Sequence, residues 1–200
     1  MPLPHGTGAW EYVGLEFSTT AYALDSKGVE VMSGVGNSSK TLVGAVYAAS
    51  AGTIVDDSSH RDVASWFNRK GKTCVTAWPS DGEWVGGSFG ELKTSLTTPL
   101  HCQFIAWDQD IVDWSLFGMV NDSAPAEVAS AAAGFDGAAP TTERVQFRET
   151  ANGQRYPLGL SGRASFSGDN VHYITMLGTS SASSSVTVYA TGGESVRIPQ

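Results

Sequence analysis

The residues best suited to do chemistry lie between Trp107 and Trp114, where three carboxylates separate two tryptophans. Asp108, Asp110 and Asp113 could hold Ca²⁺ through oxygen ligands, and the flanking indoles could stack on a sugar ring. The same acids also suit a turn between two strands, with the tryptophans as core or rim aromatics. This segment is therefore a candidate glycan- or calcium-binding loop, with a plain turn as the alternative.

A second candidate site surrounds Trp78 and Trp84, which flank a turn containing Pro79 and Asp81-Gly82. Beside a flexible Gly86-Gly87 loop, the two indoles could form an adhesive tip that binds a receptor or a glycan. In the alternative, both indoles pack under the loop, because large aromatic side chains usually contribute through the area that they bury.

Catalytic and cofactor motifs are sparse. Nucleophilic catalysis needs a base beside the nucleophile, but the chain lacks a Gly-x-Ser-x-Gly elbow, and residues 159–162 only half resemble one. Metal spacings such as Cys-x-x-Cys and His-x-x-x-His are also missing from the sequence. We therefore expect no enzymatic activity, no catalytic residues and no cofactor. Histidines inside predicted strands are expected to be structural; the four histidines are His5, His60, His101 and His172.

Charge argues against two classes of partner. The formal net charge is −8, and the only cluster of basic residues is Arg69-Lys70-Gly71-Lys72. Nucleic acids and anionic membranes both require a clustered basic surface, so neither is an expected partner. The sequence has neither a long apolar window nor an N-terminal signal peptide, which indicates synthesis and folding in a cytoplasm.

Two cysteines, Cys74 and Cys102, are the only thiols. They are too few for a secreted disulfide scaffold, and both fall at alternating positions within predicted strands. We expect buried free thiols that act as small hydrophobic residues, with a disulfide between them as the alternative.

Strand signals recur along the whole chain, with short turns between them. Only 16% of the residues are charged, and the chain holds 23 glycines, a composition typical of packed strands joined by tight turns. The pattern predicts an all-β fold, an antiparallel β-sandwich or jelly-roll-like domain over residues 1–200, with residues 1–10 as a short N-terminal extension. The predicted strands are 10–17, 20–24, 29–33, 41–49, 53–55, 63–68, 73–78, 84–85, 91–96, 100–107, 112–121, 128–135, 144–148, 156–166, 171–178 and 186–190.

Three local features add detail to this prediction. Residues 63–68 and 73–78 alternate around an Asn68-Arg69-Lys70-Gly71 turn, which predicts a β-hairpin. Residues 124–133 are rich in alanine and favour a short helix by propensity, but they lack an apolar stripe, so we prefer a strand or loop. Residues 179–185 form a serine-rich tract, which predicts an exposed loop.

A resemblance to a known family rests on several short segments, taken in order along the chain: Gly28–Gly34, Ser39–Gly44, Asp57-Ser58, Arg61, Ser65–Arg69 and Gly168–Ile174 with Leu177. Together they resemble a β-sandwich family of bacteriophage virion proteins that includes tail-fibre proteins. The resemblance implies a virion structural protein that assembles with itself and with other virion proteins. We expect a homotrimer. Residues 1–10 carry no coiled-coil or anchor segment, so a fibre, a tail tip and a capsid decoration are alternative positions.

Three classes of function follow. The first is a phage structural or adhesion protein, a tail fibre or other appendage, made in the bacterial cytoplasm, located in the virion and able to contact host surface glycans. The second is a carbohydrate-binding module that depends on exposed tryptophans. The third is a glycan-degrading enzyme, which requires two carboxyl groups facing each other across a cleft. The shortage of catalytic motifs favours the first.

Overall fold

The computed structural model places the chain in two compact units, residues 1–43 and residues 44–200. The prediction of one domain over residues 1–200 stays a prediction. The structure describes residues 3–4, 10–11, 22–24, 30–32, 44–50, 53–54, 56–61, 63–65, 72–94, 97–106, 110–123, 127–138, 144–148, 153–166, 170–180, 184–190 and 192–198.

The described residues contain strands and no helix, so the predicted all-β, sandwich-like fold is confirmed. Accordingly, no described helix could serve as a membrane span. In the first unit, β1 (Leu3–Pro4) pairs with β2 (Trp10–Glu11), and β3 (Tyr22–Leu24) pairs with β4 (Glu30–Met32).

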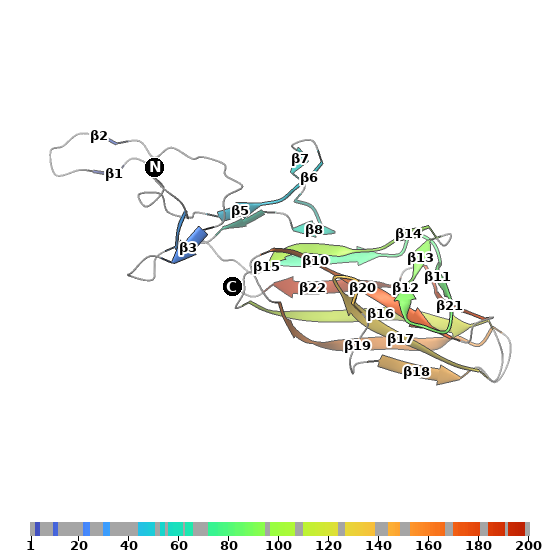
Figure 1. Ribbon diagram of the computed structural model, residues 1–200. Helices are drawn as coiled ribbons and strands as arrows, with labels where there is room; N and C mark the ends of the chain where they lie inside the picture. Colours follow the sequence, from blue (N-terminus) through green and yellow to red (C-terminus); the bar gives the residue numbers. More distant parts are fainter. Residues whose placement is uncertain are drawn as a thin grey trace. The chain divides into compact units, whose positions relative to one another are not determined.

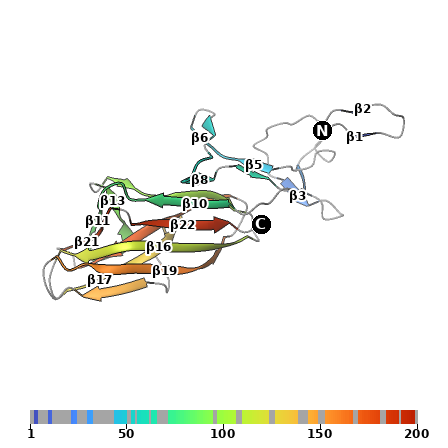
Figure 2. The same ribbon diagram turned by 180° about the vertical axis from the view of Figure 1, so that it is seen from behind.

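An eight-stranded antiparallel sheet forms one layer of the second unit. Its order is β10-β22-β16-β21-β11-β13-β14, and β19 pairs with the other edge of β16. Figure 2 shows β10, β22, β16 and β19 lying side by side. The strands are β10 (Lys72–Ala77), β11 (Gly82–Val85), β13 (Lys93–Thr94), β14 (Thr98–Pro99), β16 (Ile111–Asp122), β19 (Tyr156–Ser165), β21 (Ser185–Val188) and β22 (Gly193–Ile198).

A six-stranded sheet forms the second layer, in the order β18-β17-β20-β15-β8, with β12 also paired to β20 (Figure 1). All these pairs are antiparallel except that of β15 with β8. The strands are β8 (His60–Arg61), β12 (Gly90–Glu91), β15 (Cys102–Ala106), β17 (Val128–Phe135), β18 (Arg144–Arg148) and β20 (Asn170–Thr179). Two small pairs, β5 (Gly44–Val46) with β9 (Val63–Ser65) and β6 (Ala48–Ser50) with β7 (Thr53–Ile54), complete this unit.

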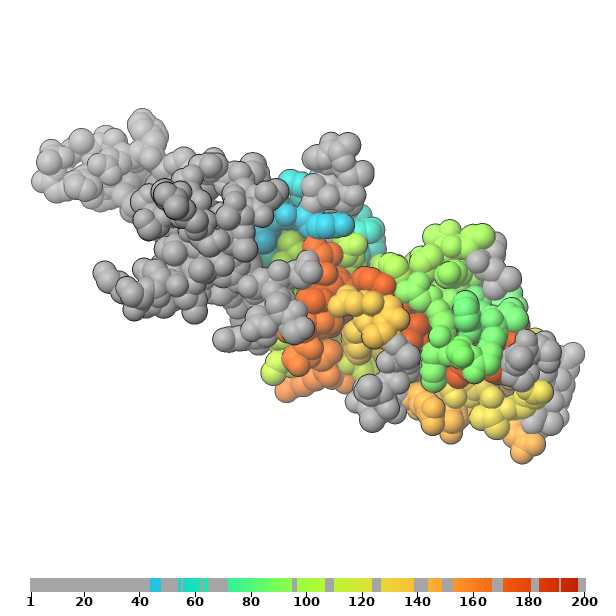
Figure 3. All heavy atoms as spheres, viewed as in Figure 1, coloured from blue at the N-terminus to red at the C-terminus, as the bar shows by residue number. Residues whose placement is uncertain are grey.

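The core lies between the two sheets, because alternate side chains of each strand point inward. Phe104 of β15 and Ile174 of β20 are fully buried, as is Val112 of β16, and Leu116 of β16 is nearly so. At one end of the sandwich, the residues of β11, β13 and β14 appear together as green spheres in Figure 3. The sandwich thus provides a rigid frame for the polar groups described below.

The alanine-rich segment is a strand, β17, rather than a helix. Ala131 and Ala133 face the core, while Gly134 lies against the side chain of Leu177, which approaches a Cβ built at this glycine to 2.7 Å. The strand is buried on both faces, which explains its small residues. Residues 124–126 of the predicted segment lie outside the described residues.

Two local predictions are wrong, and the predicted ranges miss four strands, β1, β8, β14 and β22. Val63–Ser65 pairs with β5 and Lys72–Ala77 with β22, so these strands do not form the predicted hairpin. The serine tract is not exposed at its described positions, because Ser180 and Ser184 are buried. Strand β22 lies in the middle of the large sheet although the sequence pattern did not reveal it.

Candidate functional site

Two of the predicted binding tryptophans lie in the core. Trp78 is 2% exposed and Trp114 is 3% exposed, so neither indole offers a face to a sugar. The Trp114 ring packs edge-on against Phe135 with ring centroids 5.8 Å apart. It also covers Gly162 of β19, where a Cβ would come within 2.8 Å of the ring. Both indoles are therefore core side chains, which was the alternative to sugar binding in the sequence analysis.

Trp84 differs from these two because it is only partly buried. Its Nε1 donates a hydrogen bond to the backbone oxygen of Ser88 at 2.9 Å, which ties the indole to the loop after β11. Its ring covers Gly90, where a Cβ would clash at 2.3 Å. Trp84 is thus the one described tryptophan among the candidates that keeps an accessible part, and Trp107 lies outside the described residues.

The predicted calcium ligands do not gather among the described residues. Asp110 is buried just before β16, whereas Asp113 lies on the outer side of β16 and accepts a hydrogen bond from Arg163 Nε at 2.9 Å. Asp108 lies outside the described residues. Within the described part of the chain, no three Cys, His, Asp or Glu side chains form a metal-binding group.

A pair of thiols occupies the space between the sheets. Cys74 comes from β10 in the large sheet and Cys102 from β15 in the small sheet, and both are fully buried. Their sulfur atoms are 2.7 Å apart, and both cysteines are free, as the sequence analysis expects. The hydrogen bond with Cys74 and burial raise the pKa of the Cys102 thiol in the reduced pair.

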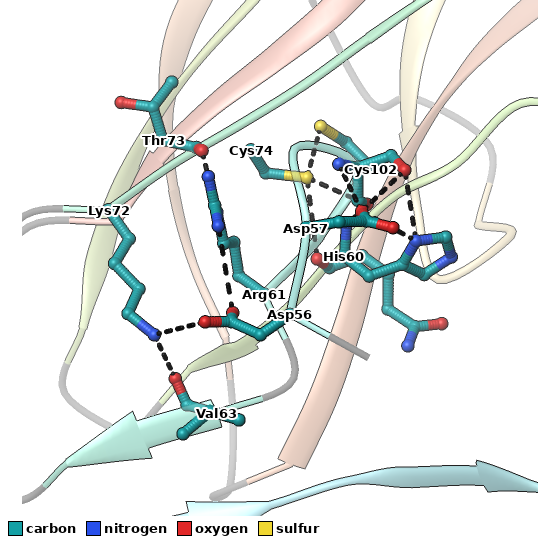
Figure 4. A network of polar contacts seen from close by, with 11 residues as sticks. Asp56, Asp57, His60, Arg61, Val63, Lys72, Thr73, Cys74 and Cys102 are labelled. Atoms are coloured by element: carbon teal, nitrogen blue, oxygen red, sulfur yellow. Dashed lines mark hydrogen bonds and ion pairs between the residues drawn. The ribbon is translucent and has the colours of Figure 1, made fainter. Parts of the chain in front are cut away.

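Residues 56–61, which we call the latch, lie beside these thiols and bridge the two sheets (Figure 4). The Ser58 oxygen accepts a hydrogen bond from Val75 N of β10, and the Ser59 oxygen accepts one from Gln103 N of β15. The Ser59 oxygen also accepts a bond from the Cys74 thiol at 3.1 Å. One short segment therefore connects both layers and covers the sulfur atoms.

Asp57 holds the latch in its turn. Its Oδ1 accepts hydrogen bonds from the backbone N–H groups of Ser59 at 2.8 Å and His60 at 2.9 Å. These bonds, led by that from Ser59, favour the charged form and lower the pKa of Asp57 to about 2. The side chain is 54% exposed, so the outer side of the latch faces solvent.

Charged side chains join the latch to β10 and β9. Arg61 Nε donates to the Thr73 oxygen at 3.0 Å. Lys72 Nζ lies 3.4 Å from Asp56 Oδ2 and donates to the Val63 oxygen at 2.5 Å. Because these groups are exposed or half-buried, we assign them a positioning role rather than a large share of the stability.

Glu194 of β22 is a carboxyl group buried in the core near the thiols. It is fully buried, and among the described residues neither carboxyl oxygen has a hydrogen-bond partner. Burial, followed by the electrostatic effect of Cys74 and Glu91, raises the pKa of Glu194 well above its ordinary value. The group is therefore held protonated, since a buried charge without a partner is strongly disfavoured.

A histidine and a carboxylate form a dyad near the start of β20. His172 Nδ1 lies 2.7 Å from Asp136 Oδ2, and Asp136 Oδ1 accepts a hydrogen bond from Tyr173 N. Asp136 has a positive φ of 51°, in the turn after β17. His172 Nε2 is buried without a hydrogen-bond partner, and the ring packs on Phe166 with centroids 4.4 Å apart. No described nucleophile meets this nitrogen, so the dyad lacks the third group of a catalytic triad.

A second histidine lies beside this dyad. His101 stacks on Tyr173 with ring centroids 4.1 Å apart, and its Nε2 lies 3.2 Å from Glu91 Oε1. Burial, then the negative charges of Glu91 and Asp136, raise the pKa of Tyr173. Each histidine therefore has a carboxylate partner, which is consistent with the structural role expected for both.

The outward side of the large sheet carries exposed apolar side chains toward both ends of β16, with the polar Asp113 and Ser115 between them. Along β16, Ile111, Phe117 and Met119 point outward with 50%, 37% and 38% of their surfaces exposed. Phe117 lies between glycines of β19 and β22, and Met119 lies opposite Pro157. Val75 of β10 is 41% exposed. We call this surface, the outward side chains of β10, β22, β16 and β19, the outer face.

Strand β19 forms an edge of the large sheet beside the outer face. Its ten residues pair with β16, and among the described residues no strand pairs with its other edge. At Gly159 a Cβ would meet nothing within 4 Å, so the surface is open there. A long unpaired edge next to exposed apolar side chains is suited to association with another chain.

Sequence reasoning did not reveal the latch or Glu194, and it brought the two thiols together only in the alternative of a disulfide. Cys74 and Cys102 are 28 positions apart, so no spacing motif connects them. Strand alternation did indicate inward-facing cysteines, but only the pairing of strands within two separate sheets brings the sulfur atoms together. The Asp57-Ser58-Ser59 sequence is a turn signal that could have identified the latch.

Comparisons with known proteins add little. No protein-family model matches the sequence, and no curated protein matches it. A solved structure described as "Structure of infectious bursal disease virus Gx strain" is similar with a TM-score of 0.35 and 14% sequence identity. The match covers 86% of this chain and 46% of that chain, so this chain spans less than half the length of that structure.

Proposed function

We propose that this protein is a structural subunit of a bacteriophage virion, located in a tail fibre or another tail or capsid appendage. The observation that carries the proposal is the outer face, where exposed apolar side chains lie beside the unpaired edge of β19. A surface of this kind suits a subunit that buries it against another protein. The sequence resemblance to phage virion proteins supports the same function.

Self-association is the form of assembly that we propose, with a homotrimer as the expected state. Closed symmetry would cover the outer face and the β19 edge in every subunit, so this edge would not be free for uncontrolled association. Other virion proteins, and a host surface glycan for an adhesive appendage, are the further partners of this proposal. The same proposal assigns the chain no enzymatic activity.

Light scattering of the purified protein tests the assembly. The wild-type chain should have about three times the monomer mass, and Phe117→Lys should shift the protein toward monomer because a charge would be buried at the contact. Val128→Lys is the matched control, because Val128 is 56% exposed on β17 in the other sheet. A wild-type monomer, or equal dissociation by both variants, would refute assembly through the outer face.

A carbohydrate-binding module is the alternative, and the partial exposure of Trp84 is the observation that favours it. In that case a monomeric wild-type chain would bind glycans on an array, and Trp84→Ala would abolish the binding. Trp78→Ala and Trp114→Ala should instead lower stability, because both indoles are buried.

A further inference from the structure

We propose that Cys74 and Cys102 form a disulfide that joins the two sheets, and that the latch controls when it forms. The inference is independent of the proposed function. It starts from the placement of the sulfur atoms, which come from opposite layers and lie 2.7 Å apart without being bonded. A disulfide bond is roughly 2.05 Å long, so small rotations of the two side chains would bring the atoms to bonding distance.

The latch separates this pair from any oxidant in solution. Both thiols are fully buried, and the Ser59 oxygen contacts the sulfur of Cys74 at 3.1 Å. The latch contains only the two-residue strand β8 at the edge of the small sheet, and Asp57 maintains its turn. A short edge segment opens at a lower free energy than the central strands do, so opening the latch is the simplest way to expose the thiols.

The reaction needs an oxidant of the small-molecule disulfide class, such as oxidised glutathione. With the latch open, the Cys74 sulfur loses its proton and attacks one sulfur of the oxidant, which releases one thiol and leaves a mixed disulfide on Cys74. The Cys102 sulfur then loses its proton, attacks the sulfur of Cys74 and releases the second thiol. The protein loses two electrons and two protons, and the oxidant is reduced to two thiols.

The order of attack follows from the positions of the two residues. The Cys74 sulfur contacts the Ser59 oxygen of the latch, whereas the Cys102 sulfur contacts the Cys74 sulfur and lies 3.9 Å from the backbone oxygen of Glu194. Opening the latch therefore uncovers Cys74 first. Cys102 acts as the resolving thiol, because it reaches the mixed disulfide without further movement of the sheets.

The test measures intact mass and free thiols after the reduced protein is incubated in oxidised glutathione. The wild-type chain should lose about 2 Da, the mass of two hydrogens, and lose both alkylation sites without forming intermolecular dimers. Its melting temperature should rise by roughly 5–10 °C in the oxidised form. Cys102→Ser should accumulate glutathione on Cys74, and Cys74→Ser should react more slowly.

A latch variant tests control by the covering segment. Asp57→Ala should speed oxidation roughly tenfold, because it removes the hydrogen bonds that hold the turn. Asp81→Ala is the matched control, since Asp81 also accepts a backbone hydrogen bond, from Ala190 N at 2.8 Å, but does not belong to the latch. If Asp57→Ala does not fold, the oxidation rate of the wild-type chain is measured instead at low urea concentrations, which favour local opening.

Two results would overturn the inference. If both thiols remain free in Asp57→Ala, or in urea below the unfolding transition, the pair does not form a disulfide in the folded protein. If Asp57→Ala and Asp81→Ala oxidise at equal rates, the latch does not control the reaction.

Discussion

Replacing Glu194 by methionine should stabilise the protein, and the gain should increase with pH. The carboxyl group is fully buried, and among the described residues neither of its oxygens has a partner. A buried polar group without a hydrogen bond costs about 1–3 kcal/mol, and methionine has a similar length without this cost. A gain of about 2 kcal/mol would raise the melting temperature by roughly 4–8 °C for a chain of this size.

The pH dependence follows from the raised pKa of Glu194. Because the folded-state pKa is above that of the unfolded chain, the folded state binds the proton more tightly. The wild-type protein should therefore lose stability as the pH rises from the ordinary value of 4.5 toward the folded-state pKa. Glu194→Met should lack this loss, so the difference between the two proteins should widen across the same range.

Urea unfolding followed by tryptophan fluorescence, at several pH values from about 4 to 8, measures both effects. Glu83→Met is the matched control because Glu83 is only partly buried on β11. A Glu194→Met variant that is less stable than wild type at every pH, or that keeps the wild-type pH dependence, would show that the carboxyl group has a partner and would refute the reasoning.

Two further predictions concern the frame and the latch. Gly193→Ala should destabilise the protein by about 1–3 kcal/mol in urea unfolding, because a Cβ would come within 2.2 Å of the Thr76 oxygen. Gly159→Ala, whose Cβ would meet nothing within 4 Å, should leave stability nearly unchanged, and equal effects would contradict the packing argument. Asp57 has a lowered pKa of about 2, so its contribution is present above the unfolded value of 3.8 and is lost as the pH falls toward 2. Hydrogen exchange at the Gln103 amide, which bonds to the latch, should increase over that range in the wild type, and an equal increase in Asp57→Asn would contradict this cause.

Strand positions were predictable from the sequence where apolar and polar residues alternate along the strand. The bounds predicted for residues 128–135 and 144–148 are those of β17 and β18. The sequence pattern did not predict strand β22, because Gly192-Gly193 resembles a turn and the inward-facing Glu194 interrupts the apolar alternation. Local patterns therefore identify strands well only when their inward side chains are apolar.

Strand partners and side-chain environments were less predictable, because both depend on residues far apart in the chain. The alternation in residues 63–68 and 73–78 is compatible with a hairpin, but β10 pairs with β22, more than a hundred positions later. Likewise, tryptophans suited to stacking on sugar are equally suited to a core, and only the sheets decide that Trp78 and Trp114 are buried.

Antibody labelling of intact phage particles from the source tests the proposed function most directly. Electron microscopy with an antibody against residues 44–200 should show label at a defined appendage of the particle, with particles of a deletion mutant left unlabelled. Wild-type particles that carry no label, like those of the deletion mutant, would contradict a structural role in the virion.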